Sequence, residues 1–227
     1  MKNTKLLMAI LVPMLFASCM APVNTRESMY PNMYSEKPTT ILVMPPINNT
    51  TNVEAKELLY TSISYPLVEA GYYVVSPHLA MEMLKSESAY DAELFIDQDA
   101  GVFARVFGAD AVVFSVIDTW QKEGFGIRTN IHYIVKSTKT NEILFERQCN
   151  LYLNLEKEHD KNDNSLLGSL IDLTASVIAT ATTDHIVAAR KCNYYIFQDL
   201  PRGPYSPEYL QDNGCGASPR NTNVTIN

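Results

Sequence analysis

Four histidines are the side chains best suited to metal binding or proton transfer, and they are scattered along the chain. His78, His132, His159 and His185 stand singly, without the His-x3-His or Cys-x2-Cys spacing that binds zinc. The sequence also lacks a Gly-x-Ser-x-Gly nucleophile motif, a phosphate-binding loop and a dinucleotide fingerprint. We therefore expect solvated or capping histidines, no metal, no cofactor and no catalytic residue.

The amino terminus carries the most specific chemical signal. Lys2 and Lys5 precede an apolar run at residues 6–16, which has the length of a signal-peptide core and is too short to span a bilayer. The motif that follows at residues 15–19, Leu-Phe-Ala-Ser-Cys, resembles the lipobox of bacterial lipoproteins. The resemblance implies that residues 1–18 are a signal peptide and that Cys19 becomes the lipidated first residue. The alternative is an ordinary secreted protein in which Cys19 is incidental.

The residue after the expected anchor indicates the cellular location of the protein. Met20, rather than Asp, follows Cys19, which by analogy favours the outer membrane, with the protein facing the periplasm. Two or more acyl chains would anchor the chain stably. Removal of residues 1–18 changes the formal net charge from −7 to −9, since only Lys2 and Lys5 are lost. A chain this acidic, without a basic cluster, is not expected to bind nucleic acid or anionic headgroups. Membrane attachment would then depend on the lipid.

Three cysteines remain after lipidation. Cys192 and Cys215 lie outside the expected core, so we predict a disulfide between them, which would pin the carboxyl-terminal segment to the domain. Cys149 falls within a predicted strand and is expected to be a buried free thiol.

The chain's hydrophobic pattern predicts an α/β fold. Continuous apolar runs predict buried strands at 41–44 and 111–117, and an i, i+3, i+4 stripe predicts a helix between the first run and a parallel strand. Alternation predicts two antiparallel strands, and a long stripe predicts a final helix. We expect a single three-layer domain with a mixed, partly parallel sheet of about five strands flanked by helices. The remaining predicted ranges are helices at 55–70, 78–85, 100–107 and 165–190 and strands at 72–75, 127–136 and 142–153.

The domain boundaries follow from the same pattern. Residues 19–37 mix Pro, Asn, Ser and Met without periodicity and are expected to be a lipidated tether. Residues 38–190 hold the predicted elements and form the domain. Residues 191–227 are expected to be an aromatic, proline-rich segment and tail.

Two short motifs resemble a known superfamily. Residues 41–50, Ile-Leu-Val-Met-Pro-Pro-Ile-Asn-Asn-Thr, are similar to the opening of the CsgG, LpoB and TolB amino-terminal superfamily, and residues 108–113, Gly-Ala-Asp-Ala-Val-Val, resemble its later Gly-Ala-Asp strand. Pro66, residues 69–74, Ile117 and Trp120 resemble a family of outer-membrane lipoproteins of unknown function. The resemblance implies a TolB amino-terminal-like fold and an envelope accessory or assembly protein without known catalysis. A CsgG-like lipoprotein is an implied partner, and a homo-oligomer is compatible with it.

Two segments are candidate binding surfaces. The carboxyl-terminal aromatic residues either contact a protein partner or cover the sheet and the helix end: Tyr194, Tyr195, Phe197, Tyr205 and Tyr209. The turn of Asn48, Asn49 and Thr50 follows the first strand, where α/β sheets bind ligands, or it caps the next helix.

Three functions remain open. The first is an assembly or stabilising partner in a CsgG-like outer-membrane secretion or adhesin system. The second is an LpoB-like adaptor that activates a peptidoglycan synthase. The modest length of the tether disfavours this role, because its 18 residues after Cys19 extend to about 60 Å at most. The third, an enzyme, is disfavoured because no nucleophile, base and orienting group can be assembled.

Overall fold

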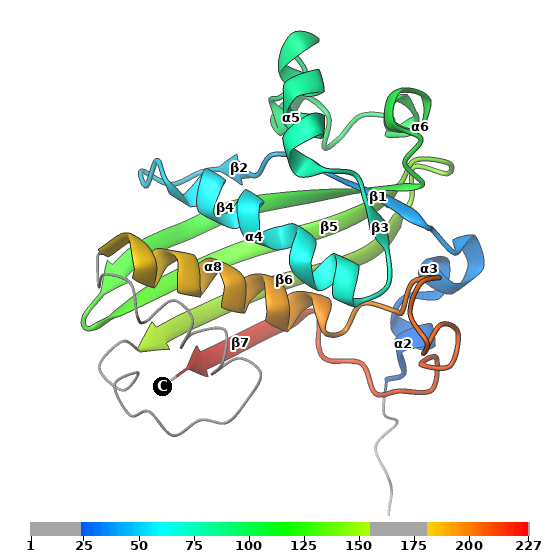
Figure 1. Ribbon diagram of the computed structural model, residues 1–227. Coiled ribbons are helices and arrows are strands. Elements are labelled where there is room, and N and C mark those ends of the chain that lie inside the picture. The colour runs from blue at the N-terminus through cyan, green and yellow to red at the C-terminus, as the bar shows by residue number, and fades with distance from the viewer. Residues whose placement is uncertain (1–23, 155–180, 227) are drawn as a thin grey trace, which may run out of the picture.

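A seven-stranded mixed sheet organises residues 24–154 and 181–226, the part of the chain that the computed structural model describes (Figure 1). The strand order is β3-β1-β4-β5-β6-β7, and β2 pairs with β4 beside β1. The strands are β1 (Thr40–Val43), β2 (Ile47–Asn48), β3 (Tyr73–Val74), β4 (Ala111–Glu123), β5 (Gly126–Ser137), β6 (Ile143–Asn154) and β7 (Asn221–Ile226).

The predicted strand–helix–strand unit is confirmed. β1 pairs in parallel with β3 on one side and with β4 on the other, and α4 (Ala55–Glu69) makes the crossover. The apolar run at 41–43 is fully buried because helices cover both faces of β1. Gly71 ends the helical unit with φ +91°, a conformation that a side chain rarely adopts.

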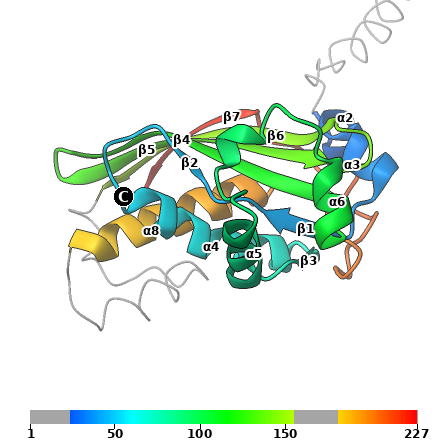
Figure 2. The same cartoon turned by 90° about the horizontal axis from the view of Figure 1, so that it is seen from above.

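Two helical layers enclose the sheet, as the three-layer prediction requires. α4 and α8 (Ala181–Phe197) lie side by side across one face (Figures 1 and 2). On the opposite face α5 (Pro77–Ser86), η2 (Ala92–Leu94) and α6 (Gly101–Phe107) form a second, smaller core with β1 and the first half of β4. Within it Phe103 packs against Phe114, with ring centroids 6.3 Å apart. The described part of the chain is thus a single mixed α/β domain.

The segment before β1 is not the plain tether expected from its sequence. Residues 26–29 form α2 (Arg26–Met29) and residues 31–36 form α3 (Pro31–Glu36), with Thr25 capping α2 through the Ser28 backbone. Tyr30 and Met33 insert into the main core and are 2 % and 3 % exposed. The prediction of a tether is therefore wrong from Asn24 onward. Two apolar side chains in a short segment leave no periodicity to read, yet they are sufficient to dock it.

The carboxyl-terminal boundary at residue 190 is also wrong. α8 continues to Phe197, because Cys192, Ile196 and Phe197 extend its buried stripe. The chain then returns over the domain and ends in β7, which pairs in parallel with β6. The start of the long helix predicted at 165–190 lies outside the described residues. Among the helices described, none is long and apolar enough to cross a membrane.

Candidate functional site

The half of the sheet that faces away from α4 and α8 is polar beyond the point where the smaller core ends. No helix among the described residues covers it (Figure 2). We call this surface the open face. Register places its side chains in three rows across β4, β5, β6 and β7: Val116, His132, Gln148 and Asn221; Thr119, Asn130, Asn150 and Asn223; Gln121, Arg128, Tyr152 and Thr225.

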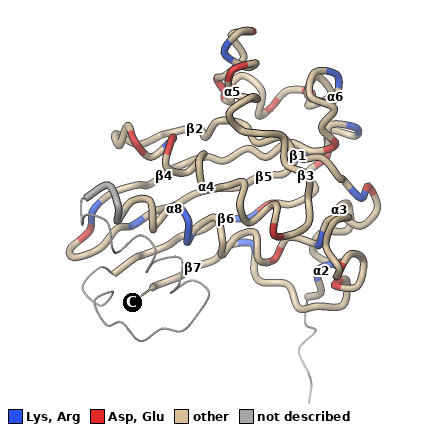
Figure 3. Tube along the Cα trace, viewed as in Figure 1, with Lys and Arg blue, Asp and Glu red and all other residues tan. Residues whose placement is uncertain are grey.

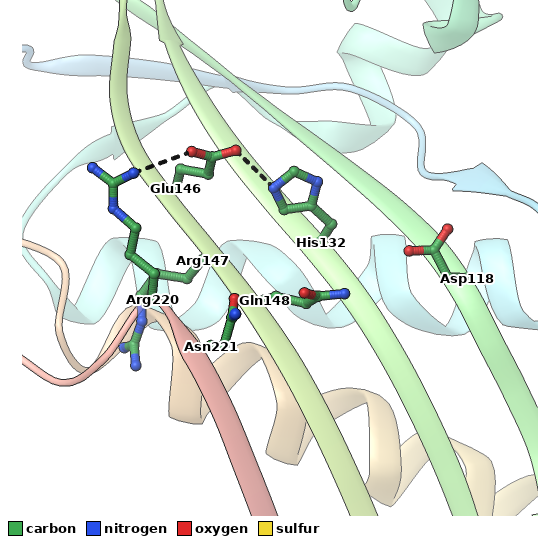
Figure 4. Close-up of a pocket in the computed structure, with 7 residues that line it drawn as sticks. All are labelled: Asp118, His132, Glu146, Arg147, Gln148, Arg220 and Asn221. Atoms are coloured by element: carbon green, nitrogen blue, oxygen red, sulfur yellow. Dashed lines mark hydrogen bonds and ion pairs between the residues drawn. The ribbon is translucent and has the colours of Figure 1, made fainter.

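A shallow pocket of about 270 Å³ lies at the upper row of the open face (Figure 4). Its lining residues are Asp118, His132, Glu146, Arg147, Gln148, Arg220 and Asn221. His132 Nε2 lies 3.0 Å from Glu146 Oε1, and Arg220 reaches the other oxygen of the same carboxylate at 3.8 Å. Asp118 lies apart from this group on β4 (Figure 4). Glu146 is therefore held between two cationic or hydrogen-bonding partners, which favours a structural role for this carboxylate.

Side-chain amides dominate the remainder of the open face. Gln148 Nε2 donates to Asn130 Oδ1 at 3.0 Å, and Asn130, Asn150 and Asn223 stand in register on adjacent strands. Amides offer both donors and acceptors and carry no charge, so they suit another polar surface. They do not act as nucleophiles. In the described ranges, no three His, Cys, Asp or Glu side chains converge closely enough to hold a metal. The chemistry that the open face offers is hydrogen bonding through neutral side chains.

Charge is spread thinly over the molecule. Lys and Arg are dispersed along the described trace and do not gather over one element (Figure 3). One exposed ion pair, Arg128 with Glu123, lies at the end of the β4–β5 hairpin. Hydrogen bonding to Arg128 lowers the pKa of Glu123. Such a distribution is compatible with a protein surface as partner and poorly suited to a polyanion.

The turn at residues 48–50 is closed on itself. Asn48 Oδ1 accepts from the backbone and hydroxyl of Thr50 at 3.1 and 2.8 Å, and Asn48 Nδ2 donates to the Asn52 carbonyl. Asn52 in turn accepts from the backbone amides of Glu54 and Ala55 at 3.0 and 3.2 Å. Asn49 donates to Asp118. The turn therefore supports the start of α4 indirectly: Asn48 and Thr50 hold Asn52, and the side chain of Asn52, not those of residues 48–50, accepts from the amides where α4 begins.

The five aromatic residues at the carboxyl-terminal side divide into two groups. Phe197 is 1 % exposed and packs on Tyr133 and Phe145, so its predicted place on an interaction surface is wrong. Tyr195 packs against the main core, and Tyr194 lies beside it with ring centroids 6.1 Å apart. Tyr209 is half-buried, whereas Tyr205 is 68 % exposed. These residues mainly cover the helix end, and they do not form one contiguous aromatic patch.

The predicted disulfide partners are not brought together. Cys192 is completely buried in α8, with its thiol 3.0 Å from Thr129 Oγ1. Cys215 is exposed in the loop before β7, and in this structure Cys192 and Cys215 are not bonded to each other or to Cys149. Sequence reasoning ended the helix at residue 190 and so left Cys192 in the tail. Cys149 is buried as expected. Cys19 lies outside the described residues.

A network of ion pairs docks α2 and α3 onto the carboxyl-terminal loop. Arg26 donates to Asp212 Oδ2 at 2.8 Å and to the Gln198 carbonyl, and Tyr34 donates to Asp212 Oδ1 at 3.1 Å. The backbone amide of Arg202 adds a further bond to Asp212. Asp212 is 3 % exposed, so its charge requires these partners. The pair with Asp212 outweighs burial of the guanidinium and raises the pKa of Arg26.

A second buried network lies behind the first. Tyr30 donates to Asp199 Oδ2 at 2.9 Å, and Arg147 approaches the same carboxylate at 3.7 Å. Arg147 also donates to the Pro219 carbonyl and to Thr222 Oγ1. Backbone pairing continues this contact upstream, because Ala217 donates to the Asn24 carbonyl at 2.7 Å. The chain is therefore fastened to its domain from Asn24 onward.

Sequence reasoning missed both the open face and the docking networks. The alternation at 127–136 placed Ile127, Thr129 and Ile131 on one side, so Arg128, Asn130 and His132 were readable as the opposite side. The partners of Arg26 and Tyr30 are more than 150 residues away, and no local pattern connects them.

Comparisons with known proteins identify relatives of the chain. Residues 29–198 match the family described as "Putative lipoprotein GNA1162-like". The chain is 26 % identical over 161 residues to "Putative lipoprotein NMB1124/NMB1162" of Neisseria meningitidis serogroup B, covering 68 % of this chain and 72 % of that protein.

Solved structures are similar to this chain over part of its length. The crystal structure of lipoprotein GNA1162 from N. meningitidis aligns with a TM-score of 0.49 and 22 % identity over 63 % of this chain and 99 % of that one. The LpoB C-terminal domain from Escherichia coli aligns with a TM-score of 0.35 and 17 % identity, over 54 % of this chain and 94 % of that one.

Proposed function

The chain belongs to the GNA1162-like lipoprotein family, and from that premise we propose that it is a lipid-anchored accessory protein of the cell envelope. In this proposal Cys19 carries the lipid in the outer membrane, and the domain faces the periplasm. Its role is to assemble or stabilise a membrane-bound partner, for which a CsgG-like outer-membrane secretion or adhesin system is the working candidate. The proposal includes no catalytic step.

The observation that carries this proposal is the docking of the amino-terminal segment. Backbone pairing begins at Asn24, and the buried networks of Arg26 and Tyr30 continue it. Four residues, 20–23, then separate Cys19 from the docked chain. Four extended residues span at most about 15 Å. A lipid on Cys19 would therefore hold the domain at the membrane surface.

The length of this connection distinguishes the assembly role from the adaptor role. An adaptor that reaches from the outer membrane to a peptidoglycan synthase requires a span that four residues do not provide. A partner that is itself in or on the outer membrane lies within reach. The docked segment thus favours the assembly role over the adaptor role.

The open face is the surface that we assign to the partner. Its asparagine, glutamine and threonine side chains offer hydrogen bonds in register over four strands. Few charges accompany them, so the matching surface would be polar and largely neutral. A protein surface or a second copy of this chain meets that description, whereas nucleic acid does not.

A crosslinked pull-down of the intact lipoprotein from its native envelope tests the proposal. We expect mass spectrometry to find an outer-membrane partner that is lost with Cys19→Ala. Asn150→Lys, in the middle of the open face, should also abolish recovery. Thr61→Lys, an equally exposed change on α4, is the matched control and should retain it.

The outcomes separate the alternatives. Recovery of a CsgG-like lipoprotein or pore supports the assembly role. Recovery of a peptidoglycan synthase would replace it with the adaptor role, and crosslinks between copies of the chain alone would show a homo-oligomer. Equal recovery with Asn150→Lys and Thr61→Lys would exclude the open face as the contact.

A further inference from the structure

Two buried cysteines face each other between the sheet and α8. Cys149 lies on β6 and Cys192 on α8, and each is 0 % exposed within the main hydrophobic core. Cys149 lies near enough to Cys192 to contribute, after burial, to the raised pKa of the Cys192 thiol. Their positions are separated by about 40 residues of chain, so the contact is tertiary.

Strand register explains how the two thiols meet. Cys149 stands opposite Ile131 in the β5–β6 ladder, on the face that α8 covers. The side chain of Cys192 on α8 contacts β5, and its sulfur lies 3.0 Å from Thr129 Oγ1. Thr129 and Ile131 are two residues apart on one strand and therefore project from the same face. Both cysteines consequently occupy one site above β5 and β6.

The helix is held in this orientation by the residue next to Cys192. Asn193 Oδ1 accepts from the Tyr133 hydroxyl at 2.7 Å, and its Nδ2 donates to Ser62 Oγ on α4 at 2.9 Å. These bonds connect α8 to the sheet and to the adjacent helix, and all three residues lie on the inner side of the helical layer. Rotation of α8 that would separate Cys192 from Cys149 would break both of them.

We propose that Cys149 and Cys192 form a disulfide in the exported protein, a covalent link between β6 and α8. The inference rests on the proposed function, since the envelope is the compartment in which such bonds persist. In the reaction each thiol loses a proton, and the two sulfurs join as two electrons pass to a disulfide-bearing oxidant. That oxidant, a thiol oxidoreductase or oxidised glutathione, leaves as a dithiol or as two thiols.

Burial sets the time at which this bond can form. Desolvation and the neighbouring Cys149 thiol raise the pKa of Cys192 well above its usual value, so the folded protein holds little reactive thiolate. The bond must then form before α8 closes over the sheet. Once formed, it is shielded from soluble reductants by the same packing.

Intact-mass spectrometry of the protein from its native envelope, unfolded and alkylated in a single step, tests the inference. We expect the lipidated mature chain to carry one alkyl group, on Cys215, and three after prior reduction in denaturant. Lipidated protein with three alkyl groups before reduction would overturn the disulfide and leave the proposed location intact.

A refolding experiment separates failure of the disulfide from failure of the proposed function. Full-length chain is refolded in a glutathione redox buffer and alkylated in the same way. If envelope protein is unlipidated and still carries residues 1–18, the proposed location fails, and this second measurement decides the disulfide. Because this chain keeps Cys19 unmodified, two alkyl groups support the disulfide, and four overturn it.

Single substitutions identify the cysteines involved. Cys215→Ser should still yield a bridged chain with no alkyl group, whereas Cys149→Ala should leave two alkylated thiols. Closing a loop of about 40 residues should lower the unfolding equilibrium constant about a thousandfold relative to the reduced chain. An unfolding midpoint that reductant in denaturant leaves unchanged in the wild type would contradict the link.

Discussion

At the scale of single residues, the phenol of Tyr30 joins the amino-terminal segment to two distant parts of the chain. Its ring packs on Phe145 with centroids 4.6 Å apart, and its hydroxyl donates to Asp199. Asp199 also accepts from the Ser218 backbone and lies near Arg147. A single side chain therefore contributes both apolar burial and a charge-assisted hydrogen bond to the docked segment.

Tyr30→Phe should lower the free energy of unfolding by about 1–2 kcal/mol. The substitution keeps the ring and removes one donor from a buried carboxylate. Urea denaturation measures the change, and Tyr205→Phe serves as the exposed control with no expected effect. Identical midpoints for Tyr30→Phe and wild type would show that Asp199 is satisfied without the phenol.

Buried tyrosines also determine how the protein responds to alkali. Burial raises the pKa of Tyr60 to about 12, and burial together with Asp199 raises that of Tyr30. Tyr72 and Tyr133 are shifted in the same direction, again chiefly by burial. An unfolded tyrosine ionises near pH 10. Above that pH the unfolded chain gives up protons that the folded chain retains, and unfolding becomes more favourable.

We therefore expect stability to be insensitive to tyrosine ionisation below about pH 9 and to fall between about pH 10 and 12. Tyrosinate absorbance and circular dichroism, followed together during an alkaline titration, should change in one transition for the buried tyrosines. Full ionisation of all tyrosines near pH 10 with the fold intact would contradict the assigned burial.

The type of a residue and its spacing in the sequence predicted its contacts poorly, because those contacts depend on the elements packed around it. The prediction of solvated or capping histidines is wrong for His185, which is 7 % exposed and accepts a hydrogen bond from Trp120 Nε1. His132 pairs with Glu146, and His159 lies outside the described residues. The predicted cysteine pairing failed because it depended on where a helix ends, and Cys192 lies beyond the expected end. Which side chains meet is decided by the register and rotation of elements, and these were not readable from spacing.

At the scale of elements, the start of α4 depends on Asn52. Its side chain accepts from two backbone amides at the first turn, where helices leave such donors unpaired. Asn52→Ala should cost about 1 kcal/mol of stability, the usual value for the loss of such a cap. Asn49→Ala, which removes only a surface bond to Asp118, is the matched control. Chemical denaturation distinguishes them, and equal losses would disprove the assigned cap.

The junction between α4 and β3 depends on Gly71. A methyl group there would lie 2.4 Å from the Ser206 backbone nitrogen, and the backbone has φ +91°. Gly71→Ala should therefore destabilise the fold by about 2–4 kcal/mol through strain and displacement of the carboxyl-terminal loop. Gly214→Ala, which meets no atom within 4 Å, should be nearly neutral. Thermal unfolding of both variants makes the comparison. A neutral Gly71→Ala would mean that the loop is free to move.

Elements with a continuous apolar run or strong periodicity were predictable, and polar ones were not. β1, β4 and the parallel crossover follow from buried runs that read directly from the sequence. β7, with the sequence Asn-Thr-Asn-Val-Thr-Ile, was missed because its side chains are half polar and it lies at the edge of the sheet. α2 and α3 were missed because they are short and gain their stability from tertiary contacts.

At the scale of the whole molecule, the amino-terminal helices and the loop before β7 meet at one end of the sheet, and β7 runs from there toward the opposite end (Figure 1). The amino-terminal helices pack on the loop that leads into β7, so the proposed anchor and the carboxyl-terminal loop lie at one end of the sheet (Figure 1). The open face extends away from this end over four strands. A domain held in this way would present the open face beside the membrane.

The central claim is that the docked segment holds the domain at the membrane surface, and Cys215 offers a direct probe of it. This thiol is exposed, and the backbone carbonyl of Cys215 accepts from Arg26, so a dye there reports on the dock. We would reconstitute the lipidated protein in liposomes and measure quenching of the dye by headgroup spin labels. A 20-residue Gly/Ser insertion between Val23 and Asn24 provides the comparison.

The native chain should be strongly quenched, because about 15 Å at most separates the lipid from the dock, whereas the inserted chain should lose most of that quenching. Disrupting the dock with Arg26→Ala and Tyr30→Phe together should reduce quenching in the same direction. Quenching of the native chain no stronger than that of the inserted chain would contradict the membrane-held domain.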